Sequence, residues 1–274
     1  MKYLEAGPSA AGWSRLSKVL KCPRFYALDR GPRDSTSDAL IRGDLMHVAL
    51  AHHYANLRCA QRGDADEYMS AEDAVAHCVA NQPSDALCSA YDRWAHKVIS
   101  VYHQYCSKYI VPSWTIRDVE NVISTKFADP EMDREYAFSS RLDLEVEHQG
   151  KVYYVDHKTS FAILPKTYNK YTLSGQFLGQ QIMGQERHGE RFGGIILNLI
   201  GWDDRKPVSS FKRKVLPYAE KSVAMFPETV ILAERVIARY KGREAMDWPG
   251  AHVSTACHTT YGPCPFFNQC RMGG

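Results

Sequence analysis

The sequence predicts an α/β fold, a mixed β-sheet flanked by helices, with a helical N-terminal part and a cysteine-rich C-terminal segment. Three observations indicate this fold. Apolar residues repeat at helical spacing through residues 14–110, and residues 115–160 have strand character. Helical and strand patterns then alternate as far as residue 243. The 274 residues suffice for one large domain, which we divide into parts 1–112, 113–245 and 246–274.

The N-terminal part contains three helical stretches, separated by loops rich in Gly, Pro, Asp and Ser (GPRDSTSD and NQPSD). The helical stretches are WSRLSKVLKCPRFYALDR, LIRGDLMHVALAHHYANLRC and SAYDRWAHKVISVYHQYCSKYI. The pattern changes near Pro112. Three strands are expected next: TIRDVENVISTKFA, EYAFSSRLDLEVEH and KVYYVDHKTS.

The remaining chain predicts a helix at 171–189, a buried strand at 193–203 and a helix at 226–243 with Pro227 near its start. From Trp248 the tail is rich in Pro, Gly and Cys, and we expect it to be irregular.

Charge and hydropathy restrict the class of protein only loosely. There are 34 Lys and Arg against 31 Asp and Glu, so any nucleic-acid surface must be local. KPVSSFKRK (206–214) is the densest basic stretch, and a solvated basic loop would explain it equally well. Neither a signal peptide nor an apolar run of membrane-spanning length is visible, so we expect a cytoplasmic protein with reduced thiols.

One hairpin places two acids opposite each other. In RLDLEVEHQGKVYYVDHKTS (141–160), a two-residue turn at Gln149–Gly150 sets a register in which Asp143 falls opposite Asp156. Like charges across a strand pair repel, whereas a hard divalent cation such as Mg²⁺ would be bound by both carboxylates. Lys158 shares the face of Asp156, because side chains alternate along a strand.

This face suits metal-assisted phosphodiester hydrolysis, with Asp143 and Asp156 as ligands and Lys158 orienting water or neutralising phosphate charge. We include His157 among the metal-ligand candidates, although alternation directs its side chain to the opposite face. Without the second acid, Asp-x-Lys alone would more often be a surface ion pair.

These residues resemble the PD-(D/E)xK nucleases, in their RecB-like branch, which implies a restriction-endonuclease-like core. LKCPRFYALDR (20–30) is similar to the family's Cys-Pro-Arg-x-Tyr helix, and RGDLMHVAL (42–50) to its Gly-x-x-x-His helix. GQFLGQQIMG (175–184) is similar to its glutamine helix. The resemblance implies that His47 binds metal and that Gln176 belongs to the catalytic set. The chain departs from the family at Gln180, where a tyrosine is usual.

Three assignments have alternatives in the sequence itself. Gln176 alone would fit a helix-surface residue, but the hairpin geometry favours a place in the site. His47 lies on an apolar helical face and would fit a core histidine, but the nearby acid pair favours the ligand. Glu120, in the strand RDVENVIS, would fit either the metal site or an exposed surface, and both remain open.

Three cysteines in CHTTYGPCPFFNQC (257–270) lack a fourth local ligand, and Cys22 is the best candidate to supply it. The resemblance implies that Cys22, Cys257, Cys264 and Cys270 bind a four-iron four-sulfur cluster. Four thiolates also suit zinc, which stays the alternative. We expect the other cysteines, at 59, 78, 88 and 106, to be buried or incidental thiols.

The sequence therefore predicts a Mg²⁺- or Mn²⁺-dependent DNA nuclease. The resemblance alone implies an exonuclease acting on single-stranded ends. The alternatives are a structure-selective endonuclease on the same core, and a non-catalytic DNA-binding or assembly subunit of a recombination or spacer-acquisition complex. A complete set of His47, Asp143, Asp156 and Lys158 argues against the non-catalytic reading.

Overall fold

The computed structural model describes residues 1–5, 7, 9–29, 37–65, 67–109, 113–203, 206, 208–251, 254–259 and 262–272. Most of the loop expected at 31–38, together with Pro112 and Pro207, lies outside the described residues.

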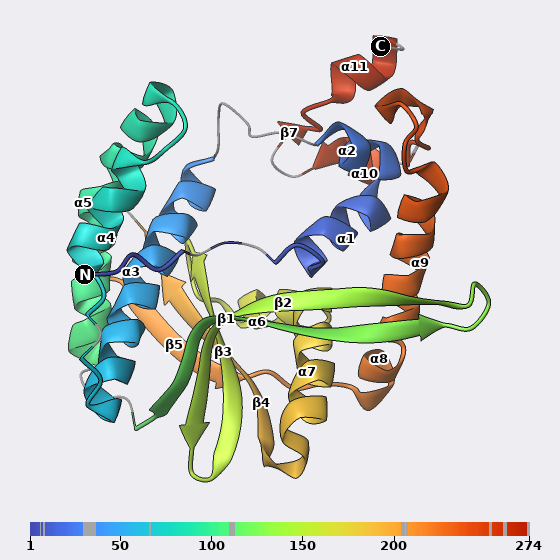
Figure 1. Ribbon diagram of the computed structural model, residues 1–274. Helices are drawn as coiled ribbons and strands as arrows, with labels where there is room; N and C mark the ends of the chain where they lie inside the picture. The colour runs from blue at the N-terminus through green and yellow to red at the C-terminus, as the bar shows by residue number, and fades with distance from the viewer. Residues whose placement is uncertain are drawn as a thin grey trace.

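A five-stranded sheet with strand order β1-β2-β3-β4-β5 forms the centre of the fold (Figure 1). All neighbouring strands are antiparallel except β3 and β4, so the sheet is mixed as predicted. The parallel pair needs a long crossover, which α6 and α7 provide. The strands are β1 (Thr115–Asp129), β2 (Arg134–His148), β3 (Lys151–Ser160), β4 (Phe192–Gly201) and β5 (Ser210–Val215); the crossover helices are α6 (Pro165–Thr172) and α7 (Gly175–His188).

Five helices precede the sheet: α1 (Trp13–Lys21), α2 (Pro23–Leu28), α3 (Asp38–Arg62), α4 (Ala71–Ala80) and α5 (Asp85–Lys108). Serine caps start the last three, since the side chains of Ser37, Ser70 and Ser84 each accept a backbone N–H from the first turn. Pro23 explains the break between α1 and α2, because a proline fits the first turn of a helix but not its interior.

The C-terminal part packs beside the first two helices (Figure 1). It contains α8 (Glu220–Ala224), α9 (Phe226–Tyr240), the one-turn helix η2 (Ala245–Asp247), α10 (Ser254–Cys257), β6 (His258–Thr259), β7 (Gly262–Pro263) and α11 (Phe267–Met272). Another one-turn helix, η1 (Gly189–Arg191), joins α7 to β4. The tail therefore has short regular elements where the sequence predicted irregular chain.

Each face of the sheet is covered by its own apolar core. Helices α3, α4 and α5 pack on one face with a core that includes Leu45, Tyr105 and Val155. Helices α1, α7 and α9 contribute to the other core, which includes Phe177 and Leu197. β4 is buried along almost its whole length, as a strand covered on both faces must be.

The N-terminal segment connects these two layers. Lys2 pairs with the chain before α4, since its N–H donates to Glu67 O over 2.9 Å, and Leu4 N–H donates to His52 on α3. Farther along, Ser9 Oγ donates to the carbonyl of Ser139 on β2 over 2.8 Å. The segment thus runs from the helical layer to the sheet before α1 begins.

The structure confirms the predicted fold class and the three strands at 115–160. Two details differ. The helix predicted at 171–189 is interrupted between α6 and α7 at Leu173 and Ser174. The basic stretch 206–214 ends in the edge strand β5 rather than forming a loop throughout, because its Phe211 is buried against the core. Across the described chain, no helix has the length and apolarity needed to cross a bilayer.

Candidate metal and catalytic site

Three acids from three neighbouring strands form a row across the sheet. Val119 pairs with Leu144 and Asn121 with Leu142, so Glu120 stands opposite Asp143. In the next ladder, between β2 and β3, Leu144 pairs with Val155. Continuing this register by one residue places Asp143 opposite Asp156. The hairpin turns at Gln149 and Gly150, and this register is the one that the sequence predicted.

The β2–β3 ladder stops at this row. The last Cα partners are Leu144 and Val155, and beyond them the backbone N–H of His157 donates to the side chain of Asp143, Oδ2, over 2.7 Å. A carboxylate thus replaces a strand carbonyl as the acceptor. The Asp143 side chain is thereby held at a fixed place beside β3.

A helix contributes the fourth member of this cluster. His47, on α3, places Nδ1 3.4 Å from Asp143 Oδ2. Ligand atoms of His47, Glu120 and Asp143 all lie within 4.8 Å of one another, and within the described ranges these are the only three His, Cys, Asp or Glu side chains so grouped. Glu120, left open by the sequence, therefore belongs to the site.

Glu120 reaches the site through an unusual backbone conformation. Its φ is +52°, a value that costs a non-glycine residue free energy and persists where the surrounding structure enforces it. The other non-glycine residues with positive φ, Asp133 and Gln149, occupy hairpin turns. Glu120 lies within β1, and its side chain is buried. Such strain within a strand is typical of functional sites.

Asp156 and Lys158 form the second half of the site. Lys158 Nζ lies 2.6 Å from Asp156 Oδ2, as their shared face predicts. Gln176, in the first turn of α7, donates from Nε2 to Asp156 Oδ1 over 2.6 Å. Asp156 is therefore held from both sides, by a cation and by an amide. Gln180, one turn later, is buried and donates to Ser140 Oγ instead.

Burial and mutual charge shift the pKa values of these groups. Burial lowers the pKa of His47, but the adjacent Asp143 carboxylate outweighs burial and raises it to about 9. Burial acts to raise the pKa of Asp143, yet His47 holds it below its usual range. Burial and then Asp143 raise the pKa of Glu120, and burial raises that of Asp156 against the pull of Lys158. Clustered perturbed groups of this kind mark functional sites.

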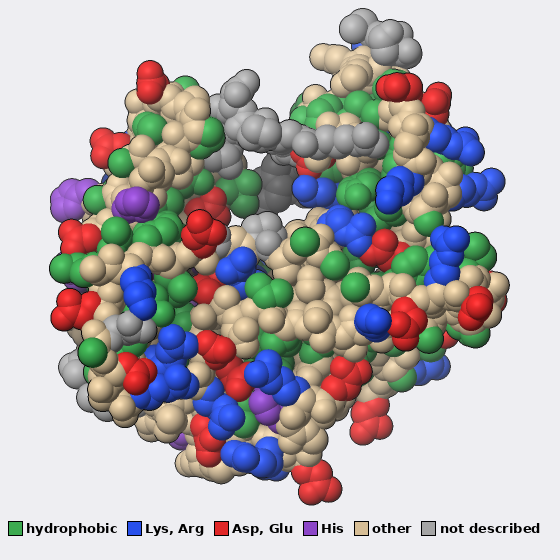
Figure 2. Space-filling model, viewed as in Figure 1, with side chains coloured by type: hydrophobic (Ala, Val, Ile, Leu, Met, Phe, Trp, Pro, Cys, Tyr) green, Lys and Arg blue, Asp and Glu red, His purple; other side chains and the backbone are tan. Residues whose placement is uncertain are grey.

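The cluster lies at the base of a hollow with a volume of about 670 Å³. Its walls come from the N-terminal segment, the start of α1, the first half of α3 and the strands that bear the acids. The N-terminal residues that line it are Tyr3, Gly7, Ser9, Gly12, Trp13 and Ser14. Figure 2 shows the molecule hollowed between the α3–α5 side and the α1–α2 side. The acids are reached from solvent through this opening.

A family model matches most of the chain. The model of the PD-(D/E)XK nuclease superfamily matches residues 12–271. The chain belongs to this superfamily. The crystal structure of SSO0001 covers 80% of this chain and 84% of its own, with 11% identity and a TM-score of 0.33, a likeness too weak to carry an argument. No curated protein matches the sequence.

His157 lies outside the group formed by His47, Glu120 and Asp143. Its ring faces α3, stacks on Tyr54 with the planes 11° apart, and has Nδ1 2.6 Å from the amide nitrogen of Asn198. Burial lowers its pKa to about 3, so the imidazole is neutral. Strand alternation explains this placement, and His157 is not a member of the metal-ligand group formed by His47, Glu120 and Asp143.

The four cysteines predicted to bind a cluster lie where the junction of α1 and α2 meets the C-terminal tail. Cys22 joins α1 to α2, where Arg24 N–H donates to Pro249 O and the Phe25 ring packs on Phe266 of the tail. Burial raises the pKa of the Cys264 thiol, and Cys270, Cys22 and Cys257 raise it further, so these three cysteines lie near Cys264. Cys59, Cys78, Cys88 and Cys106 lie in helices away from them.

Proposed function

We propose that this protein is a Mg²⁺- or Mn²⁺-dependent DNA exonuclease acting on single-stranded ends, with a structural four-iron four-sulfur cluster. One observation carries the nuclease proposal: Glu120, Asp143 and His47 converge beside the Asp156–Lys158 pair at the base of a hollow. Membership of the PD-(D/E)XK superfamily supports the reaction class.

The donor set fits a hard or borderline divalent cation. Two carboxylates and one imidazole within 4.8 Å suit Mg²⁺ or Mn²⁺, and the imidazole favours Mn²⁺. Asp156, which follows Asp143 in register, would add a carboxylate oxygen. A cation held here would acidify water and withdraw charge from the scissile phosphate.

Two side chains of the protein hold Asp156 in position. Gln176 and Lys158 fix the two oxygens of Asp156, so this carboxylate cannot rotate away from the phosphate site. Burial acts to lower the pKa of Lys158, but Asp156 and Asp143 together raise it above its usual value, so Lys158 stays an ammonium at neutral pH. Its charge would stabilise the negative charge that develops on the phosphate oxygens and would orient water for attack.

The single-strand preference rests on access. Tyr3, Gly7, Ser9 and Gly12 of the N-terminal segment line the hollow together with α3 and the strands, so the acids lie within a walled hollow. An unpaired strand enters such a hollow more easily than a duplex does. A free end can enter it without opening the N-terminal segment, which favours exonucleolytic over endonucleolytic cleavage.

Four cysteines form the candidate cluster site. Cys270, Cys22 and Cys257 are near enough to the Cys264 thiol to raise its pKa. Four thiolates suit a four-iron four-sulfur cluster, and tetrahedral zinc is the alternative.

Purified protein incubated with end-labelled DNA and Mn²⁺ tests the function. Linear single strands should be shortened from an end, while circular single strands should stay intact. Cutting of circles would establish the endonuclease alternative. A wild-type protein that binds DNA but cuts neither form, with Mn²⁺ bound, would establish the non-catalytic alternative.

A further inference from the structure

The edge strand β5 presents its lysines to the same sheet face as the catalytic pair. Asp156 pairs with Leu197, and Leu197 with Lys214; likewise Lys158 pairs with Leu199, and Leu199 with Lys212. Side chains of paired residues point to the same face. Neighbouring strands lie about 4.8 Å apart, so each lysine sits about 10 Å across the sheet from the catalytic residue in its row.

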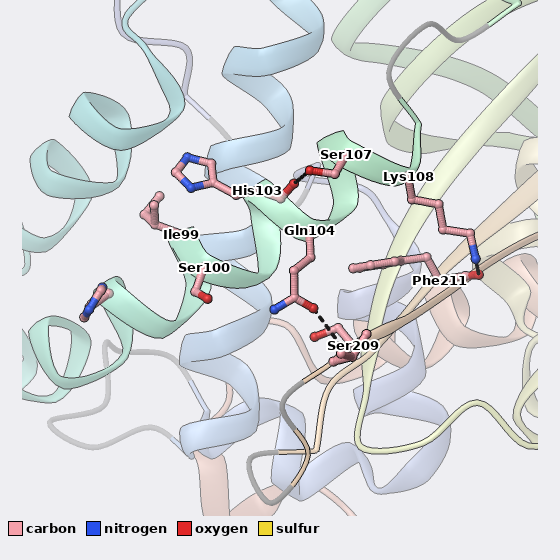
Figure 3. A pocket seen from close by; sticks show the side chains of 10 residues that line it. Ile99, Ser100, His103, Gln104, Ser107, Lys108, Ser209 and Phe211 are labelled. Atoms are coloured by element: carbon pink, nitrogen blue, oxygen red, sulfur yellow. Dashed lines mark hydrogen bonds between the residues drawn. The ribbon is translucent and has the colours of Figure 1, made fainter.

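The opposite face of β5 is occupied by structural contacts. Phe211 lines a cavity of about 770 Å³ beside α5, where Gln104 accepts the N–H of Ser209 and Lys108 donates to the Phe211 carbonyl (Figure 3). Arg213 is also used there: its guanidinium lies 3.6 Å from the Tyr109 ring centroid and donates to the hydroxyl of Tyr105. Of the three basic residues of the Lys-Arg-Lys run, only the two lysines face the catalytic side.

These lysines lie beside two tyrosines of α6, the buried Tyr168 and the half-buried Tyr171. Lys212 Nζ and Lys214 Nζ lie 5.8 Å and 5.2 Å from the Tyr168 ring centroid, and Lys170 Nζ lies 4.7 Å from that of Tyr171. Tyr171 in turn packs on Phe177, whose ring lies 5.8 Å from the Nζ of Lys158. Ring contacts therefore connect Lys170 to the catalytic lysine, while Lys212 and Lys214 both lie over Tyr168 on the same helix.

The charge of this surface is not neutralised. Lys170, Lys212 and Lys214 are exposed, and none of them forms an ion pair with a carboxylate of the described chain. Elsewhere basic residues do have acidic partners, for example Arg58 with Asp118 and Lys126 with Glu135. Three unpaired ammonium groups beside a phosphodiesterase site complement the charge of a phosphate backbone.

We propose that Lys170, Lys212 and Lys214 form a phosphate-binding track, over which the single DNA strand runs beyond the catalytic site. This inference rests on the proposed function. The track binds backbone rather than bases, so it acts on affinity and not on sequence preference.

The experiment compares Lys212→Gln/Lys214→Gln with Lys126→Gln/Lys241→Gln, which removes the same two charges from exposed positions outside the track. Binding of a long fluorescent oligothymidine is measured in EDTA over a salt series. Each lost phosphate contact should reduce the slope of log K against log salt by about 0.7, hence about 1.4 for the track variant and none for the control. Kd should rise several-fold at constant salt in the track variant alone.

Cleavage gives the second readout. With Mn²⁺, the track variant should have a raised KM on long single strands, an unchanged kcat, and wild-type kinetics on an oligonucleotide too short to leave the catalytic hollow. Equal slopes in wild type and track variant, or equal losses in both variants, would overturn the track. Failure of the wild type to cut would instead count against the proposed function, and leave the binding comparison to decide the track.

Discussion

The backbone N–H of His157 donates to the carboxylate of Asp143 over 2.7 Å, between the two residues of β3 that carry the candidate chemistry. Asp143 is therefore fixed by the same strand segment that supplies Asp156 and Lys158. Any shift of β3 would move all three together, so the distances among them are preserved. Candidate ligands held this rigidly are favourable for catalysis, since little reorganisation is needed during the reaction.

Lys158→Ala should abolish most cleavage while sparing DNA binding. The ammonium group stabilises charge that develops during the reaction, so kcat should fall by about 100-fold or more with little change in KM. The measurement is single-turnover cleavage of end-labelled DNA with saturating Mn²⁺. Lys151→Ala is the control on the same strand, since Lys151 is exposed and its ammonium group donates to the Glu190 carbonyl. Wild-type rates in folded Lys158→Ala protein would remove Lys158 from the mechanism.

His47→Ala should raise the Mn²⁺ concentration required for half-maximal activity. The imidazole is a candidate ligand, and its loss should weaken metal affinity about tenfold or more. His53→Ala on the same helix is the control, because His53 faces Tyr102 and not the acids. If both variants titrate like wild type, His47 is a core histidine.

Glu120→Gln should separate metal binding from folding. The substitution keeps the size of the side chain and removes a carboxylate that burial and Asp143 both destabilise in ionised form. We expect no loss of Tm in EDTA, but a smaller rise of Tm on adding Mn²⁺, since a ligand stabilises the fold in proportion to its affinity. Glu135→Gln, at an exposed pair on the distal hairpin, should keep the full rise. An undiminished rise for Glu120→Gln would place Glu120 outside the metal site.

Cys22→Ala should lose iron and stability together. Anaerobically purified wild type should be brown, with about four irons per chain, whereas the variant should be colourless with a lowered Tm. Cys59→Ala, buried within α3, should keep its iron. Stoichiometric zinc in iron-replete wild type would replace the cluster with a zinc site, and a metal-replete Cys22→Ala protein would exclude Cys22 as a ligand.

Gly179→Ala should destabilise the fold, whereas Gly43→Ala should not. A Cβ at Gly179 would overlap the ring of Phe138, which is fully buried and cannot move aside, so we expect a loss of about 1–3 kcal/mol. At Gly43 a Cβ would make an ordinary contact, 3.5 Å from Thr159 Oγ1, and alanine favours the helix. Denaturant unfolding measures both, and equal stabilities would contradict the packing of α7 on β2.

The sequence predicted the Asp143–Asp156 register because the hairpin turn is local. Gln149 and Gly150 both adopt positive φ, which a two-residue turn demands, and the turn alone sets every pair that follows. The place of Glu120 could not be predicted in this way. Its positive φ lies inside a strand, and only tertiary packing enforces it. A charged residue flanked by Val119 and Asn121 has no local signal that distinguishes a buried ligand from an exposed side chain.

The strand β5 was missed for a related reason. Its alternation of Phe211, Lys212, Arg213 and Lys214 contains one apolar residue, so a solvated basic loop was an equally good prediction. In the structure Phe211 is buried and the guanidinium of Arg213 stacks on Tyr109. Tyr109 follows α5 and lies more than 100 positions earlier in the sequence. Long-range stacking of an arginine leaves no trace in hydrophobic periodicity.

The candidate metal ligands are supplied by one helix and three strands, with His47 far from Glu120, Asp143 and Asp156 along the chain. A partly folded chain that contained the sheet alone would lack the imidazole, and one that contained α3 alone would lack the acids. Tight Mn²⁺ binding would therefore require the complete tertiary structure. During refolding it should appear only when α3 has packed on the sheet. Unfinished chains would be unable to cut nucleic acid while they are still being made.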